Sequence, residues 1–272
     1  NMTFFQMGAK STTMAISDLA AKGVHCQLTI ASGVFPGDYS GQETVDIVKG
    51  IQQISHECGA KFLGGDTNEG NDLVLSVVAA GVQQQQKLIK RQTANIGDYI
   101  YTSGPFGLTG AGFKIFLENV SSSKQQRELF YKAVYEPKPK CHLSSFLTDH
   151  GLITSCIDSS DGLAWSLYEL IRDRSNLGII LTELPVHPLV IEFAEDNNLN
   201  PLDLVFYGGE EFELVFTVGE KEAETFKKRI AKSKINVNLI GKITSENPGE
   251  VFFEDEGTTT LIKQKGWEHF KK

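Results

Sequence analysis

The pattern of hydrophobic and polar positions predicts alternating helices and strands in the first hundred residues. Apolar side chains spaced three to four apart favour two helices, each followed by a glycine that suits a helix C-terminus, over residues 7–22 and 43–58. Alternating or uniformly apolar runs favour four strands, over residues 24–31, 61–63, 73–82 and 99–102. A loop is expected over residues 33–39, between the first strand and the second helix.

From residue 103 onward helical spacing predominates. It predicts helices over residues 108–119, 123–135, 140–149, 162–174, 187–198 and 220–232. Strands are predicted over residues 152–158, 177–182, 211–218 and 237–244, followed by a C-terminal hairpin. Because strands and helices alternate without regular βαβ repetition, we expect α+β domains with mixed sheets, divided into residues 1–103 and 104–272.

The composition is typical of a soluble globular protein. Of the 272 residues, 40% are hydrophobic and 22% are charged, and no apolar run approaches the roughly 20 residues that span a bilayer. The net charge of −8 argues against a nucleic-acid partner, which requires a basic face, but allows a small phosphorylated ligand neutralised by metal ions. The four cysteines show no zinc-ligand spacing and are expected to be reduced thiols in the cytoplasm.

A predicted strand-to-helix turn carries two carboxylates in the sequence DSSDG, residues 158–162. Capping of the helix by Ser160 or Asp161 is one interpretation, but it leaves Asp158, at the end of the strand, unexplained. The other interpretation is a ligand site. There the helix N-terminus and the serine hydroxyl contact phosphate oxygens, while the two carboxylates bind divalent cations.

The sequence KFLGGDT, residues 61–67, places another carboxylate after two glycines. Gly64 and Gly65 permit positive φ angles and the close approach of a ligand. A turn that ends the strand, with Asp66 accepting a backbone hydrogen bond, also explains the motif. The chain contains neither the P-loop pattern G-x-x-x-x-G-K-[ST] nor G-x-G-x-x-G in register. A phosphate at this motif would therefore be bound through a metal ion rather than through a lysine side chain.

Four acidic residues at the ends of predicted elements are expected to form one cluster: Asp18, Asp66, Asp158 and Asp161. One Mg²⁺ ion keeps several waters and takes one or two carboxylates, so four carboxylates favour two or more Mg²⁺ ions. Such ions would bridge a polyphosphate, which is the electrostatic arrangement of phosphoryl transfer.

Seven short motifs follow one another along the chain. They are ISDLAAKG (16–23), GGDT (64–67), RQTANIGDYIYTSG (91–104), DSSDGLAWSL (158–167), YGGEEFELVFT (207–217), IGKI (240–243) and GWEHF (266–270). Their order resembles the thiamine-monophosphate kinase family, part of an ATP-binding superfamily that includes aminoimidazole ribonucleotide synthetase and a hydrogenase maturation protein. SDGL with GGEEFEL is specific for the kinase branch. The family often has GGEDYEL, so Glu211 and Phe212 are conservative departures.

The resemblance implies a two-domain fold of the aminoimidazole ribonucleotide synthetase type. The N-terminal domain would pair with that of a second subunit into a dimeric β-barrel, and the C-terminal domain would be α/β sandwich-like. The implied reaction is transfer of the γ-phosphoryl group of ATP to thiamine monophosphate, with several Mg²⁺ ions. The family carries a further segment before the first helix, with more metal-binding acids, so we expect the N-terminal domain to be incomplete here.

The resemblance also implies roles for individual residues. The metal ligands would be Asp18, Asp66, Asp158 and Asp161. Contacts with ATP would come from Gly65, Asp66, Arg91 and Ser160, and Glu210 and Trp267 would lie near the thiamine. Each of three residues also has a plain interpretation, namely Arg91 as a solvated charge, Glu210 as a turn acid and Trp267 as a packing residue.

No catalytic base is expected, because the acceptor phosphate is already ionised at neutral pH. The chain would instead hold two anions in line and screen their repulsion, with Arg91 contributing. Two alternatives remain open. One is another ATP-using member of the superfamily, similar to aminoimidazole ribonucleotide synthetase or the hydrogenase maturation protein, and the other is a nucleotide-binding paralogue without activity.

Overall fold

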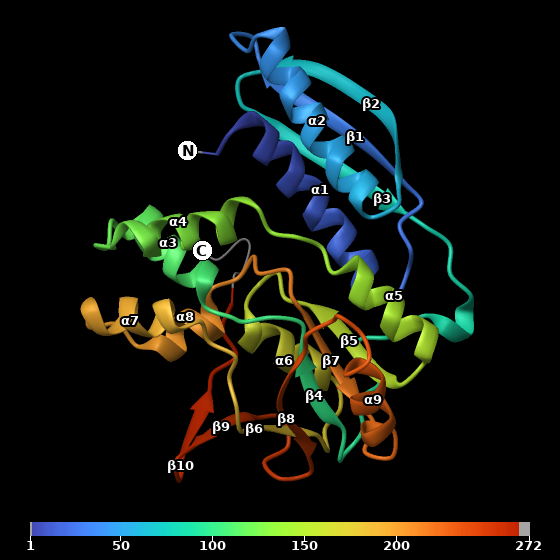
Figure 1. Ribbon diagram of the computed structural model, residues 1–272, viewed down its shortest axis with the longest axis vertical. Coiled ribbons are helices and arrows are strands. Elements are labelled where there is room, and N and C mark those ends of the chain that lie inside the picture. The colour runs from blue at the N-terminus through green and yellow to red at the C-terminus, as the bar shows by residue number, and fades with distance from the viewer. Residues whose placement is uncertain (1, 267–272) are drawn as a thin grey trace.

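The computed structural model describes residues 2–266, and within this range the chain forms two β-sheets with helices around them (Figure 1). The smaller sheet has three strands in the order β2-β1-β3. The larger sheet has seven, in the order β10-β9-β6-β8-β4-β7-β5, and combines parallel with antiparallel pairs. The prediction of α+β architecture with mixed sheets is therefore confirmed.

Two helices cover one face of the smaller sheet, and each begins with a capping box. Thr3 and Gln6 exchange hydrogen bonds at the start of α1, as do Ser40 and Glu43 at the start of α2. Helix α1 also contacts β5 and α5, so it joins the smaller sheet to the larger one. The bounds in this part are α1 (Phe4–Ala21), β1 (Leu28–Pro36), α2 (Gly41–Glu57), β2 (Lys61–Gly70), β3 (Val74–Ala80) and the 3₁₀ turn η1 (Gln85–Lys87).

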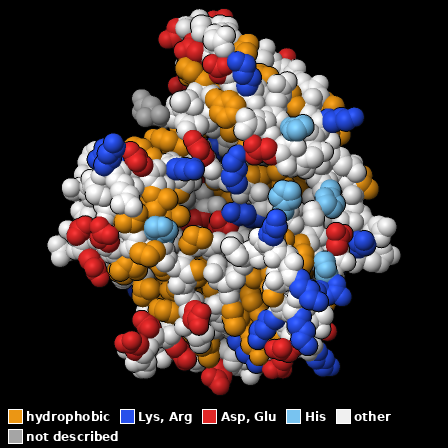
Figure 2. Space-filling view, in the orientation of Figure 1, with side chains coloured by type: hydrophobic (Ala, Val, Ile, Leu, Met, Phe, Trp, Pro, Cys, Tyr) orange, Lys and Arg blue, Asp and Glu red, His pale blue; other side chains and the backbone are white. Residues whose placement is uncertain are grey.

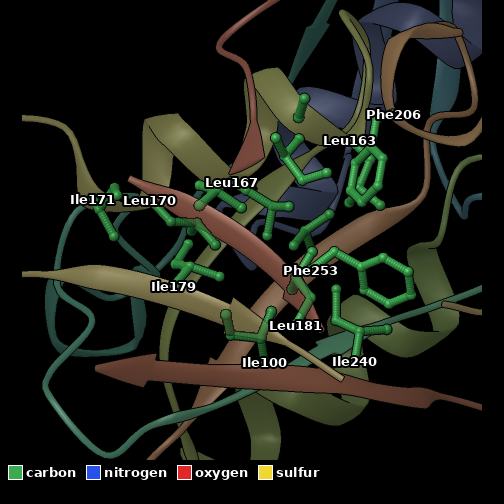
Figure 3. Close-up of a cluster of buried hydrophobic side chains, with 14 of the residues drawn as sticks. Ile100, Leu163, Leu167, Leu170, Ile171, Ile179, Leu181, Phe206, Ile240 and Phe253 are labelled. Atoms are coloured by element: carbon green, nitrogen blue, oxygen red, sulfur yellow. The ribbon is translucent and has the colours of Figure 1, made fainter. Parts of the chain in front are cut away.

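The larger sheet is covered on both faces. Figure 3 shows Leu163, Leu167 and Leu170 of α6 packed toward Ile179 and Leu181 of β6 in one fully buried cluster. Helices α5 and α9 pack on the opposite face. The elements of this layer are β4 (Tyr99–Thr102), α5 (Cys141–His150), β5 (Ile153–Asp158), α6 (Leu163–Ile171), β6 (Gly178–Leu181), β7 (Leu214–Val218), α9 (Ala223–Ile230), β8 (Asn238–Thr244), β9 (Val251–Asp255) and β10 (Thr258–Ile262).

Four further helices form a separate cluster beside the larger sheet, around Phe130 and Phe193. They are α3 (Leu108–Glu118), α4 (Lys124–Tyr135), α7 (Pro188–Asp196) and α8 (Pro201–Tyr207). The sequence pattern does not predict α8, because seven residues are too few to show a helical period. Asn200 and Pro201 nevertheless form a standard start, since the Asn200 side chain accepts the Leu202 N–H and proline occupies the first turn.

Two predictions about the smaller sheet are wrong. Residues 33–36, expected in a loop, continue strand β1, and strand β2 runs through the glycine pair to Gly70 instead of ending in a turn. Both extensions have one cause, which is that β1 and β2 pair in parallel, with Ala31 opposite Gly65 and Ser32 opposite Asp66. Pairing between strands thus overrides the local turn preference of glycine and proline.

No helix in the described part of the chain is long and apolar enough to cross a membrane. The predicted domain boundary after residue 103 stays a prediction. Strand β4, which precedes that boundary, pairs with β7 and β8 of the larger sheet.

Candidate functional site

A cavity of about 660 Å³ lies where helix α1 faces helices α3 and α8. Its wall combines apolar and aromatic side chains with charged groups of both signs, among them Met14, Phe113, Tyr207, Asp161, Asp203, Glu210, Lys114 and Lys265. Figure 2 shows acidic and basic side chains close together at the centre of this face of the molecule, below the smaller sheet. A volume in this range suits a small organic ligand.

Two loops from different parts of the sequence meet at this cavity. The N–H of Glu210 donates to the carbonyl of Ser160 at 2.7 Å, and the N–H of Phe212 donates to the carbonyl of Ser159 at 2.9 Å. Glu210 and Phe212 have φ angles of 58° and 52°, a left-handed conformation that non-glycine residues rarely adopt. Such strain persists only where the surroundings impose it, and it is concentrated at functional sites.

Helix α1 contributes a cation to this site that sequence reasoning missed. Lys10 Nζ lies 2.6 Å from Glu210 Oε2 and donates to the carbonyl of Val134 at 2.8 Å. The lysine side chain is 12% exposed, whereas that of Glu210 is 36% exposed and stays accessible from the cavity. Lys10 thereby holds a proposed substrate-binding carboxylate in place. The signal in the sequence was a single basic residue within the small and apolar residues of the first helix.

Asp158 lies at the end of β5 as a buried carboxyl group. The Ser17 hydroxyl donates to its Oδ2 at 2.7 Å. Burial raises the pKa of Asp158, and the nearby charge of Asp18 acts in the same direction. The charge of Asp18 on α1 thus acts on the carboxyl group at the end of β5, while a shared metal site of the two stays a prediction.

Two basic residues share the surroundings of Asp158. Burial, followed by the charge of Arg91, lowers the pKa of Lys22, while the carboxylates of Asp158 and Asp18 act in the opposite direction. Arg91 also pairs with the buried carboxylate of Glu169, with 3.3 Å between Nη1 and Oε2. The end of β5 thus has both carboxylates and basic side chains nearby. Carboxylates can bind metal ions and basic groups can contact phosphate oxygens, so the combination suits a metal-bound polyphosphate.

Asp66 lies on the edge strand β2, exposed, where it accepts a hydrogen bond from Asn68 at 2.9 Å. A Cβ atom added to the neighbouring Gly65 would lie 1.6 Å from the carbonyl oxygen of Ala31, so the glycine is required by strand pairing alone. Within residues 2–266 no three acidic, histidine or cysteine side chains are grouped so that they could hold a metal ion. An electrostatic influence links Asp18 to Asp158, whereas the cluster of four carboxylates stays a prediction.

Glu211 is a second residue whose importance the sequence did not reveal. It is completely buried beside the loops of the cavity, and its Oε1 accepts a hydrogen bond from the Gly107 N–H at 3.3 Å. Its Oε2 is buried without a hydrogen-bond partner in the described part of the chain. Burial raises the pKa of Glu211 to about 8, so the protonated carboxyl is favoured at neutral pH.

The C-terminal end of the described chain runs along the cavity. Lys265 lines it, and an added Cβ on Gly266 would meet the carbonyl oxygen of Asp161 at 2.4 Å. Trp267, predicted to lie near the thiamine, is outside the described residues.

Comparison with known families covers nearly the whole chain. A model described as AIR synthase related protein, N-terminal domain, matches residues 1–83, and the model of the corresponding C-terminal domain matches residues 95–254. The chain is 33% identical over 270 residues to a thiamine-monophosphate kinase from Nitrosopumilus maritimus, covering 99% of this chain and 84% of the relative. It is 30% identical to that of Pyrococcus abyssi, covering 98% and 80%.

Solved structures share the fold. The tt0281 protein of Thermus thermophilus superposes with a TM-score of 0.82 at 29% identity, over 93% of this chain and 79% of that protein. AaThiL, solved in complex with AMPPCP and TMP, gives a TM-score of 0.80 over 97% and 81%, and at 21% identity this likeness shows the fold alone. These matches confirm the resemblance and the two-domain fold that it implies.

Proposed function

The chain belongs to the thiamine-monophosphate kinase family, and on that premise we propose that it transfers the γ-phosphoryl group of ATP to thiamine monophosphate, giving thiamine diphosphate. The observation that carries the proposal is the junction of loops 158–162 and 208–212 at the cavity. One loop follows a buried carboxylate and ends at a helix, and the other presents Glu210 in a strained conformation. Both loops belong to motifs that carry the family resemblance.

The cavity suits the organic part of the proposed acceptor. Thiamine carries a cationic thiazolium ring, which acidic side chains and aromatic faces attract. The cavity supplies both, with Asp161 and Glu210 beside Phe113 and Tyr207. We propose that Glu210, held by Lys10, and Trp267 contact the thiamine.

The end of β5 suits the proposed phosphate site. Mg²⁺ prefers oxygen ligands and takes one or two carboxylates, which Asp158 and Asp18 fit. When bound, Mg²⁺ would neutralise the charge that develops on the transferred phosphoryl group. Ser17 fixes the orientation of the Asp158 carboxylate, and Ser160 stands two residues further along the same loop. Roles for Asp66 and Asp161 as further ligands, and for Gly65 and Arg91 in ATP binding, are part of this proposal.

The reaction requires no general base from the chain, because the attacking phosphate oxygen is ionised at neutral pH. The contribution of the protein is to align two anions and to screen their repulsion. The charge of Lys22 acts on the Asp158 carboxyl group, and the charge of Arg91 acts on Lys22. They are therefore proposed to screen the phosphates.

We further propose a homodimer formed through the open face of the smaller sheet. Helices α1 and α2 cover only the other face. Four large apolar side chains of the sheet are 42–62% exposed, namely Ile30, Leu63, Val74 and Val78. Ile30 lies directly opposite Val78 in the sheet, so these side chains form a continuous apolar surface. A second copy of the chain, pairing to complete a β-barrel, would cover it. A cytoplasmic location is supported by the use of ATP and by the four free cysteines.

Incubation of the protein with ATP, Mg²⁺ and thiamine monophosphate tests the proposal. Chromatography should detect thiamine diphosphate and ADP in equal amounts, and chelation of Mg²⁺ should abolish both. Unphosphorylated thiamine is the matched control, and it should not be converted. Absence of thiamine diphosphate with the full-length protein would refute the proposed reaction.

A further inference from the structure

Three of the four cysteines gather where helix α2 ends against the start of α5. Cys58 is the C-cap residue of α2, and Cys141 is the first residue of α5. Their sulfur atoms lie 2.7 Å apart, although 83 positions separate the two residues in sequence. Both are partly exposed, whereas Cys26, which packs in the same cluster, is buried. The two sulfurs in contact thus come from helices that cover different sheets.

The surroundings hold these two helices together in the vicinity of the sulfur pair. Lys138 Nζ lies 2.9 Å from Glu57 Oε2, immediately before Cys58. Directly before Cys141, Lys140 Nζ lies 2.7 Å from Glu213 Oε1. The first ion pair restricts separation of the segments that carry the two thiols, and the second fixes the segment before Cys141, so the contact does not depend on the cysteines alone.

The two thiols are chemically unequal. The hydrogen bond between the two sulfur atoms lowers the pKa of Cys141, while the same hydrogen bond, together with burial, raises the pKa of Cys58. The position of Cys141 at the N-terminus of a ten-residue helix favours its thiolate further. One thiol is therefore suited to attack, and the other is suited to resolve the product.

We propose that Cys58 and Cys141 are a reversible oxidation site, at which a disulfide links α2 to α5. A disulfide has a sulfur–sulfur distance of about 2.05 Å, so the two atoms need to approach by only about 0.6 Å. This inference does not depend on the proposed kinase activity.

The oxidant would be a low-molecular-weight disulfide such as oxidised glutathione. The Cys141 thiolate attacks one of its sulfur atoms, which forms a mixed disulfide and releases one small thiolate. Cys58 then transfers its proton to that thiolate and attacks the Cys141 sulfur, which releases the second small thiolate. Two electrons pass from the two cysteines to the oxidant, which leaves as two thiol equivalents.

Oxidation would connect the end of α2 covalently to the first residue of α5, directly after the segment 137–140. That segment carries Lys140, whose partner Glu213 directly follows the 208–212 loop of the cavity. A cross-link between residues so far apart in sequence restricts the unfolded chain strongly. We therefore expect the oxidised protein to have a higher Tm than the reduced protein, by roughly 5–10 °C.

The test is to equilibrate the native protein in glutathione buffers of defined composition, block free thiols by alkylation at low pH, and map the peptides by mass spectrometry. A peptide pair linked through Cys58 and Cys141 is expected, and it should disappear on return to a reducing buffer. Cys26 and Cys156 should be alkylated only after unfolding, because both are buried.

Single variants identify the partners. Cys58→Ser should leave Cys141 as a stable mixed disulfide with glutathione, and Cys141→Ser should leave Cys58 largely unmodified. Cys26→Ser is the matched control from the same cluster and should form the Cys58–Cys141 link and show the rise in Tm. Either of two results would overturn the proposal: no linked peptide in an oxidising buffer with protein that remains folded, or a link that requires Cys26.

Discussion

Asp158 is the residue for which we propose both a structural and a chemical role. Its carboxyl group is buried at the end of β5, where the hydroxyl of Ser17 donates to it. Burial of a carboxylate is costly unless positive charge or hydrogen bonds compensate it. A bound cation would provide that compensation, and this accounts for a buried acid beside a second acid, Asp18.

Asp158→Asn should separate the two roles. The amide retains the size of the side chain and can still accept the Ser17 hydrogen bond, so the fold should remain, as circular dichroism would show. Calorimetry should find that Mg²⁺-dependent binding of a non-hydrolysable ATP analogue is weakened at least about tenfold, or about 1.4 kcal/mol. Asp46→Asn, at a half-exposed position on α2, is the control. Binding with unchanged Mg²⁺ dependence would leave Asp158 with a structural role only.

Lys10 is expected to act through Glu210. Lys10→Met removes the largely buried cation that pairs with Glu210 and leaves the Glu210 carboxylate free to change its orientation. The KM for thiamine monophosphate should rise about tenfold while the KM for ATP stays constant, and Lys10→Arg should restore part of the loss. Lys49→Met, which breaks an exposed pair on α2, should change neither constant. Equal effects on both substrates would argue for general damage to the site.

The raised pKa of Glu211 is expected to make the free energy of unfolding depend on pH. Its pKa is about 8 in the folded chain against an ordinary value of 4.5, so between these values the folded state holds a proton that the unfolded state has lost. The free energy of unfolding should therefore fall as pH rises from about 5 to 8, by on the order of 1 kcal/mol per pH unit. Below about pH 4.5 both states are protonated, and this contribution to the slope disappears.

Denaturant titrations across this pH range provide the measurement. Glu211→Gln, a neutral group of the same shape, should flatten the slope relative to the unmodified protein. Asp158, whose pKa is also raised, contributes in the same direction in both proteins. The exposed Glu254→Gln serves as control, and an identical slope in all three proteins would contradict the assignment.

At the scale of elements, the close approach of β1 and β2 explains why glycine occupies position 65. Gly65→Ala would place a methyl group 1.6 Å from the carbonyl oxygen of Ala31, so the strands must separate. We expect a loss of about 3 kcal/mol or more in the free energy of unfolding. Gly41→Ala, in the first turn of α2, meets no atom within 4 Å and should be close to neutral. Equal stability of the two variants in denaturant titrations would disprove the role of close strand approach.

The same contact explains what the sequence could and could not predict. Helices α1 and α2 were predictable because each has a regular apolar stripe and a glycine stop. The extent of β2 was not, because Gly64 and Gly65 have a local preference for turns that only the pairing with β1 overrides. Helix α8 was missed because it is shorter than the window in which a period can be recognised.

The candidate site was predictable where the chemistry lies in short motifs, as in DSSDG and GGEE. Lys10 and Glu211 were not recognised, because their importance arises from contacts with residues far away in sequence. Lys10 meets Glu210 across 200 positions, and Glu211 accepts a hydrogen bond from the N–H of Gly107, 104 positions away. Spacing in the sequence contains no information about such contacts.

At the scale of the whole molecule, helix α1 connects the smaller sheet to both parts of the site. Lys10 reaches the 208–212 loop, and two turns later Ser17 reaches Asp158 at the end of β5. A shift of the smaller sheet relative to the larger one would therefore move both contacts at once. For this reason the proposed packing of the smaller sheet against a second subunit would matter for the site as well as for assembly.

Val78→Lys tests that assembly. Val78 is 53% exposed on the open face of the smaller sheet, opposite Ile30, and a lysine there would bring a charge into the proposed interface. Light scattering coupled to size-exclusion chromatography should give the mass of two chains for the unmodified protein and of one chain for the variant. Leu261→Lys, an exposed position on β10 of the larger sheet, should remain dimeric. A dimeric Val78→Lys protein would place the interface elsewhere.

Because α1 packs on the covered face of the same sheet and holds Lys10 and Ser17, the monomeric variant should also bind ATP and thiamine monophosphate more weakly, whereas the Leu261→Lys control should not.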